Sequence, residues 1–386
     1  MSGGLVSFRA FGLERRRRAR RRSMPTRPED QIRLLHSRSQ VVLVVVLIAA
    51  WVLLPLVLQD FWLDVLARCG LAAVGAIGLN LLTGYTGQIS LGHAFFIGCG
   101  AYVAAWFGVQ QGLPLWVWLP VCALVGAAIG ALVGPFALRL RGDYLAIVTI
   151  GLLYIGSYIF TNWDTVTGGQ AGTATNAPAT IGPIDFAHLE LFGRTFTRRQ
   201  GMFYLVWLVV GIVALLAVNL VRTRPGRAMQ AVRDQDVAAE VIGVSLARYK
   251  IGAFAVSSAC AAVAGGLFGL VQQFVNPSDF GGAPGLVLSI TYVAMIIIGG
   301  IGTIRGAVIG ALVVAGLPQL VQHISQSTKI PFVQSGSGGS GYLSVFALNQ
   351  IIFGILIVVF LLFESRGLAA VLDRARAYFR TWPFSR

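Results

Sequence analysis

The sequence predicts an all-α polytopic membrane protein with about ten transmembrane helices and both termini on the cytoplasmic side. Hydrophobic residues make up 56% of the 386 residues, and charged residues only 12%, whereas soluble domains are about a quarter charged. Long uncharged runs separate the clusters of basic residues. This pattern excludes a soluble nucleic-acid-binding protein, although the net charge is +15.

The expected spans follow from length, because a transmembrane helix needs about 20 mostly apolar residues. Ten runs approach or meet this length. They are 41–58, 61–82, 89–110, 113–138, 143–160, 201–221, 251–271, 284–301, 304–322 and 345–363.

Orientation follows from lysine and arginine, which are enriched in cytoplasmic loops. With the N-terminus inside, 25 of the 30 basic residues fall in inner segments, four fall in outer loops, and Arg68 lies within a span. This asymmetry predicts an even number of spans, because both basic termini must lie on the same side.

The expected organisation has three parts. Residues 1–40 form a basic cytoplasmic tail that we expect to be disordered and close to anionic lipid headgroups. Residues 41–363 form the transmembrane domain, and 364–386 a basic cytoplasmic tail. Within the domain, 161–200 is an outer loop long enough to be either a docking surface for an external partner or a mobile loop. Residues 222–250 form a long cytoplasmic loop.

Catalytic and metal-binding patterns are absent from the sequence. It has no phosphate-binding G-x-x-x-x-G-K-[ST] motif, and its four histidines and four cysteines are too scattered for a metal site. We therefore expect no catalytic residue, no metal and no cofactor in this chain. Charged residues are also sparse within the spans. This argues against proton-coupled transport and favours a passive pore or a permease energised by another subunit.

The cytoplasmic loop predicts a helix over 226–243. Its apolar residues recur at three- and four-residue spacing, and these are Ala228, Met229, Val232, Ala239 and Ile242. Gly243 suits the left-handed position that ends a helix. Such a helix can lie on the membrane surface or dock into a groove of a cytoplasmic partner. The mixed charges and small residues favour docking.

A second segment, 84–102, carries glycines that interrupt an apolar run. In membranes, such glycines allow close helix approach or a broken helix that lines a polar cavity. Asn80, Gln88, Ser90 and His93 could then face a transported solute. The alternative is that these polar side chains satisfy backbone groups at a short inner turn.

A third segment, 299–311, contains Gly306 and Gly310 at G-x-x-x-G spacing. Two small residues one helical turn apart let neighbouring helices approach closely. We expect this segment to serve helix packing, with Thr303 and Arg305 at the inner turn.

Together these segments resemble the permease subunits of branched-chain amino acid importers of the ABC type, and particularly the LivM branch. The resemblance covers about residues 65–368. Its motifs are 78–94, the Arg-Gly-Asp-Tyr-Leu-Ala run at 141–146 with Thr149, Gly226–Ala228 with Ala231–Asp234, Ala238–Ala239 with Gly243, and Gly299–Gly306. The sequence departs from the usual pattern of this family at two positions. In the outer loop, Thr173 follows Gly172 where the family usually has a Gly-Leu pair, and near the end Ser365 stands in place of a proline.

The resemblance implies a permease fold like that of the large vitamin B12-type importers, in a bacterial inner membrane. It implies a second, LivH-like permease, two cytoplasmic ABC ATPases and an external solute-binding protein as partners, with ATP hydrolysis outside this chain. It also assigns ATPase coupling to Gly226, Arg227, Arg233, Asp234, Ala238, Ala239 and Gly243.

Other functions remain open at this level. Related permeases of this kind carry urea, short amides or other amino acids, and a stand-alone channel or secondary carrier belongs to a different class. A membrane enzyme lacks any catalytic constellation.

Overall fold

A computed structural model describes residues 38–386 except 140–142, 183, 192–193, 328–332, 335–342, 345–350, 353, 356–357, 359–366 and 382–386. The described residues divide into two units, up to Val57 and from Leu58 onward. The first contains one apolar helix, α3 (Arg38–Val57), with Pro55 inside it. The expected disordered tail 1–37 lies outside the described residues.

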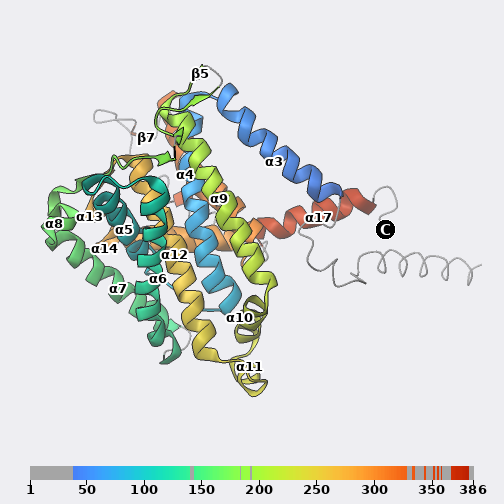
Figure 1. Ribbon diagram of the computed structural model, residues 1–386. Coiled ribbons are helices and arrows are strands. Elements are labelled where there is room, and N and C mark those ends of the chain that lie inside the picture. The colour runs from blue at the N-terminus through green and yellow to red at the C-terminus, as the bar shows by residue number, and fades with distance from the viewer. Residues whose placement is uncertain are drawn as a thin grey trace, which may run out of the picture. The chain divides into compact units, whose positions relative to one another are not determined.

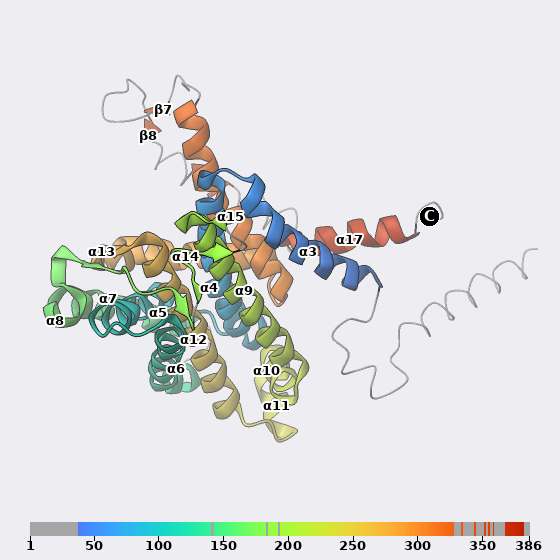
Figure 2. The same ribbon diagram turned by 45° about the horizontal axis from the view of Figure 1, so that its top comes forward.

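The second unit is a bundle of long helices (Figures 1 and 2). Its α-helices are α4 (Asp60–Leu79), α5 (His93–Val103), α6 (Leu115–Arg139), α7 (Asp143–Asn162), α8 (Asp164–Thr167), α9 (Arg198–Arg222), α10 (Arg224–Asp234), α11 (Asp236–Val241), α12 (Leu246–Gln272), α13 (Pro277–Phe280), α14 (Gly282–Gly299), α15 (Ile304–Ser327) and α17 (Gly367–Thr381). Two π-helices, η1 (Asn80–Gly84) and η2 (Ala104–Gln110), extend α4 and α5, and η3 (Gly169–Ala171) is a 3₁₀ turn.

Seven helices of the described residues are long and apolar enough to cross a membrane. They are Asp60–Gly84, Leu115–Phe136, Tyr144–Asn162, Arg198–Arg222, Leu246–Gln272, Gly282–Gly299 and Ile304–Val321. Each coincides with an expected span, which confirms an all-α polytopic membrane protein. The expected span 89–110 is the shorter α5 continued by η2, and most of 345–363 lies outside the described residues. The count of ten stays a prediction.

The core is centred on α4 and α12. Helix α4 packs against α9, α12, α14 and α15, and α12 packs along α4, α5 and α6. Small residues allow these contacts, because a Cβ at Gly100 would overlap the carbonyl oxygen of Ala262, and one at Gly265 would overlap that of Ile97. Backbone-to-backbone approach of this kind is a usual way for membrane helices to associate.

The segment 161–200, expected as an outer loop, is bonded to the helix bundle in its described part. Strand β1 (Thr173–Ala174) pairs antiparallel with β6 (Phe274–Val275) after α12. Antiparallel pairs also join β2 (Thr180–Ile181) to β3 (Ile184–Asp185), and β4 (Glu190–Leu191) to β5 (Arg194–Thr195). The Thr175 hydroxyl donates to the Gly269 carbonyl over 2.6 Å. Farther along the chain, β7 (Val333–Gln334) pairs parallel with β8 (Leu343–Ser344).

Candidate functional site

The segment 222–250, expected as a cytoplasmic loop, contains two helices rather than one. The expectation of a single helix over 226–243 is wrong, because Gln235 adopts an extended conformation, with φ −164° and ψ 108°, between α10 and α11. The break occurs because α10 and α11 are each bonded to a different part of the helix bundle. Arg233 binds the end of η1, whereas Asp236 binds Lys250 of α12 over 2.6 Å.

Gly243 terminates α11 as predicted. Its φ is +86°, in the left-handed region that favours glycine. The Gly243 amide donates to the Glu240 carbonyl, and the Val244 amide donates to the Ala239 carbonyl over 2.9 Å each. These two bonds form a Schellman motif, which satisfies carbonyls at the helix end.

The break changes which apolar residues are covered. In α10, Met229 and Val232 are buried against the bundle, and Ala239 of α11 is buried as well. Ile242, expected on the same face, is 74% exposed, and Val237 and Val241 are 62% and 82% exposed. Helix α11 therefore presents a small apolar surface, defined by Val237, Val241 and Ile242.

Arg233 ties this segment to the membrane helices. Its guanidinium Nη1 donates to the carbonyl oxygen of Gly84 over 2.5 Å. A Cβ at Gly302 would lie 2.8 Å from the same nitrogen, so the guanidinium lies against the α14–α15 turn as well. A cation at the last carbonyls of η1 is favourable because helix C-termini carry partial negative charge.

Asn80 joins the same two segments from inside the bundle. It is fully buried. Its Nδ2 donates to the carbonyl of Thr303, and its Oδ1 accepts from the amide of Gly302, both over 2.9 Å. This residue therefore pairs two backbone groups of a turn more than 220 residues away in sequence. We call Asn80, Gly84, Arg233, Gly302 and Thr303 the inner cluster.

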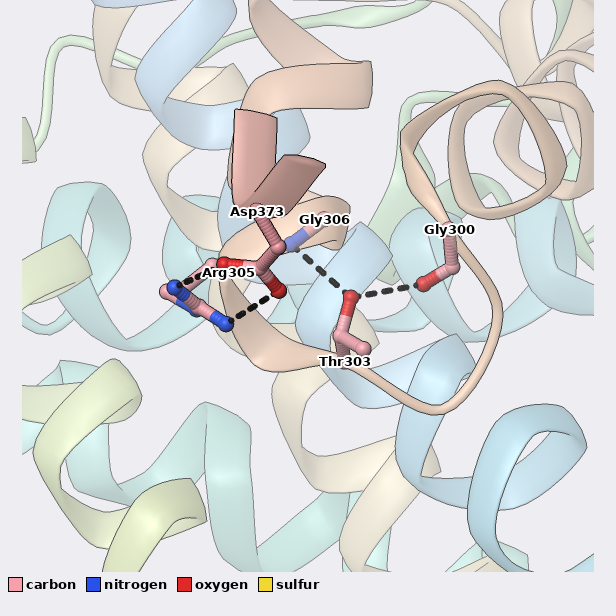
Figure 3. Close-up of polar contacts among 5 residues, drawn as sticks. All are labelled: Gly300, Thr303, Arg305, Gly306 and Asp373. Atoms are coloured by element: carbon pink, nitrogen blue, oxygen red, sulfur yellow. Dashed lines mark hydrogen bonds and ion pairs between the residues drawn. The ribbon is translucent and has the colours of Figure 1, made fainter. Parts of the chain in front are cut away.

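The turn itself is stabilised by Thr303. Its hydroxyl donates to the carbonyl of Gly300 over 2.9 Å and accepts from the amide of Gly306 over 3.2 Å (Figure 3). The first turn of α15 is thus capped by a side chain, as helix N-termini generally are. Beside it, Arg305 forms a bidentate ion pair with Asp373 of α17, at 3.2 and 3.1 Å.

Two arginines, Arg233 of the inner cluster and Arg305 beside it, bring positive charge close to Tyr85. Tyr85 follows η1 and lies outside the spanning helix Asp60–Gly84. Burial raises the pKa of its phenol, while the positive charges of Arg233 and Arg305 act in the opposite direction. The phenol is therefore neutral at physiological pH, and the arginines supply the charge of the cluster.

The other residues predicted to face a solute are also buried among helices. The His93 imidazole Nε2 lies 3.1 Å from the Gly75 carbonyl and donates to it, and its ring lies 5.0 Å from that of Tyr292. Gln88 Nε2 donates to the Lys250 carbonyl over 3.5 Å, while its Oε1 lacks a hydrogen-bond partner. Ser90 is buried in the same segment. A solute-facing role for these residues stays a prediction.

Two cavities lie elsewhere, among helices that reach the outer loop. An apolar one of about 510 Å³ is lined by α5, η2, α6, α7 and α8, including Phe95, Tyr102 and Trp163. A polar one of similar volume is lined by Ser157, Gln170 and Asn276, among others. Asn80, Gln88, Ser90 and His93 line neither cavity.

The structure brings together only part of the predicted coupling set. Arg233 reaches the inner cluster, and Gly226 packs so closely on Val221 that a Cβ would overlap the backbone. Arg227, Asp234 and Ala238 are exposed, as is Arg233 itself. Sequence reasoning missed Lys250. Its position in the sequence could have indicated a role, since Lys250 is one of two lysines in the chain and lies at the start of an apolar run.

The fold and this inner cluster define a polytopic membrane protein whose segment 222–250 is bonded to its spanning helices. The sequence matches the family described as "Branched-chain amino acid transport system / permease component" over residues 61–361. The chain belongs to this family.

Named relatives come from several transport systems. The chain is similar to the "High-affinity branched-chain amino acid transport system permease protein LivM" of Escherichia coli (strain K12), with 32% identity over 298 residues, 74% of this chain and 68% of the relative. It is 28% identical to LivH of the same organism over 280 residues, 68% of this chain and 85% of the relative.

A third relative is the "Fructose import permease protein FrcC" of Rhizobium meliloti, with 29% identity over 252 residues, 63% of this chain and 66% of the relative. No solved structure matches the chain.

Proposed function

We propose that this chain is the membrane-spanning permease subunit of an ATP-driven importer that carries leucine, isoleucine and valine across a bacterial inner membrane. The proposal rests on membership of the permease family and on similarity to LivM. Similarity to LivH supports a second permease as partner. Two cytoplasmic ATPases and an external solute-binding protein complete the proposed assembly.

The observation that carries the mechanism is the bond between Arg233 and Gly84. Helix α11 offers an exposed apolar surface, Val237, Val241 and Ile242, for a cytoplasmic ATPase. A displacement of α10 and α11 reaches η1 through the Arg233 guanidinium. The displacement then reaches the turn between α14 and α15 through the hydrogen bonds of Asn80.

The two segments that receive the displacement are suited to rearrangement. A π-helix has looser backbone hydrogen bonding than an α-helix and often occurs at functional sites. The α14–α15 turn contains Gly300 and Gly302, both with positive φ. We propose that ATP-driven closure of the ATPases moves these inner helix ends and switches the permease between inward- and outward-facing packings.

Reconstitution tests the proposal. The chain is placed in proteoliposomes with the second permease and ATPases, and uptake of labelled leucine from its binding protein is measured with and without ATP. Uptake that requires ATP and every partner supports the proposal. Flux through the chain alone, without ATP, would instead establish a channel or carrier.

A sugar is the second candidate solute because a fructose import permease is among the relatives. The earlier alternatives of urea, short amides and another amino acid also stay open. Thermal stabilisation of the partner binding protein by leucine, isoleucine, valine, urea or fructose distinguishes them, since a bound ligand raises stability by mass action.

A further inference from the structure

Helix α17 (Gly367–Thr381) is the element that the proposed transport cycle leaves without a role. It has 15 residues, which corresponds to a length of about 22 Å. It falls in the segment expected as a basic cytoplasmic tail and follows the expected last span. Both views show it running away from the bundle, across the direction of α4 and α9 (Figures 1 and 2).

The first turn of α17 is fixed to the cytoplasmic ends of α14 and α15. Gly367, with φ +71°, packs so closely that a Cβ would lie 2.5 Å from the amide nitrogen of Gly300. Ala369 is buried, and Asp373 forms the bidentate ion pair with Arg305 (Figure 3). In the orientation that the charge asymmetry predicts, the Gly300–Thr303 turn lies on the inner side, and α17 then begins at the cytoplasmic membrane surface.

The helix has two chemically different faces. Apolar residues recur at three- and four-residue spacing on one face, and these are Leu368, Val371, Leu372, Tyr378 and Phe379. Val371 and Leu372 are 41% and 52% exposed. Asp373 lies on the other face, toward Arg305. Leu368, at the start of the apolar face, packs against the core of the bundle, whereas Val371 and Leu372 remain exposed.

The sequence of α17 also places basic residues at positions that border this apolar face at helical spacing. Residues 367–381 contain Arg374, Arg376 and Arg380 but a single acidic residue, Asp373, whose charge is paired with Arg305. An apolar face bordered by arginines is typical of helices that lie in the membrane interface. Each arginine close to an anionic leaflet contributes about 1 kcal/mol of attraction.

We infer that α17 is an interfacial helix of the cytoplasmic leaflet. Its face around Val371 and Leu372 inserts among the acyl chains, and the flanking arginines contact anionic phospholipid headgroups. The occupant of this face is therefore lipid rather than an ATPase. Through the Arg305–Asp373 pair, the helix holds the α14–α15 turn at a fixed depth.

Spin labelling of the assembled transporter tests this inference. Leu372→Cys and, as the matched control from the opposite face, Ala370→Cys are labelled one at a time and reconstituted into vesicles. The vesicles contain phosphatidylcholine alone or a mixture with phosphatidylglycerol. Collisions of the nitroxide with oxygen, which dissolves in lipid, and with a water-soluble nickel chelate are then measured.

We expect a several-fold higher oxygen-to-nickel ratio at position 372 than at 370. We also expect the label at 372 to lie deeper when phosphatidylglycerol is present, and this deepening to disappear in the Arg376→Gln, Arg380→Gln background. An equal or inverted ratio would overturn membrane insertion. Protection of position 372 from both reagents, only when the ATPases are present, would make this face a protein interface. Equal depth in both lipids would overturn the headgroup contact.

Discussion

The Arg233 guanidinium donates to the carbonyl oxygen of Gly84 across 149 positions of sequence. This bond connects the segment 222–250 with the end of η1, which extends the central helix α4. Asn80, one turn before Gly84, in turn holds the α14–α15 turn. Three inner segments of the permease are therefore linked through one small cluster of side chains.

Replacing Arg233 tests whether this link transmits force. In Arg233→Glu, the bond to Gly84 is lost and a negative charge meets the negative end of η1. A charged hydrogen bond contributes about 1.5–3 kcal/mol, so we expect ATP-dependent uptake to fall by about tenfold or more while membrane insertion persists. Arg224→Glu, an equal charge change at another exposed position of α10 to which no coupling role is assigned, is the control. Equal uptake by wild type and Arg233→Glu would contradict the mechanism.

Asn80→Leu tests the second half of the cluster. The substitution leaves the amide of Gly302 and the carbonyl of Thr303 without their partner inside the bundle. Each unpaired buried group costs about 1–3 kcal/mol, so the melting temperature of the purified protein should fall by several degrees.

The matched control for Asn80 is Asn162→Leu. Asn162 is exposed, and its amide bonds only within its own helix, to Tyr158. We expect its melting temperature to stay close to that of the wild type. A similar decrease in melting temperature in both variants would show that the inner cluster contributes no more to stability than an exposed hydrogen bond does.

Gly243→Ala tests the shape of α11. At φ +86°, a side chain is strained by about 1–2 kcal/mol, which loosens the Schellman motif and displaces the exposed apolar surface of α11. We expect lower ATP-dependent uptake with normal insertion, and a stronger loss in Gly243→Pro. Gly252→Ala, where a Cβ meets open space within α12, should transport normally.

Gly310→Ala tests the close packing of α14 on α15. A Cβ at Gly310 would overlap the carbonyl oxygen of Met295, whereas one at Gly316 would lie 3.5 Å from the Cys69 sulfur, an ordinary contact. Overpacking costs about 1–3 kcal/mol. Thermal unfolding in detergent should therefore be earlier for Gly310→Ala than for Gly316→Ala, and the reverse order would refute the packing role.

Much of the fold can be predicted from the sequence, because the membrane imposes simple rules on it. A span must be long, apolar and internally hydrogen-bonded, so the hydrophobic runs locate α4, α6, α7, α9, α12, α14 and α15 within a few residues. Gly243 also marks the end of α11, whereas the orientation that charge asymmetry indicates stays a prediction. These features depend only on residues close together in the chain.

The break at Gln235 could not be predicted in this way. The apolar spacing on both sides is compatible with one continuous helix. Two tertiary bonds, Arg233 to Gly84 and Asp236 to Lys250, hold the two halves in different directions. Ile242 is consequently exposed although its spacing places it on the buried face.

The sequence by itself determined the class of protein and the positions of its spans, because both follow from the free energy of transfer between water and lipid. The orientation of the spans stays a prediction. Only the tertiary structure decided what the polar residues do. Asn80 and His93 carry no local sign of whether they face a solute or a backbone group. In the fold, their partners are Gly302, Thr303 and Gly75, and these partners come within hydrogen-bonding distance only when the helices have packed.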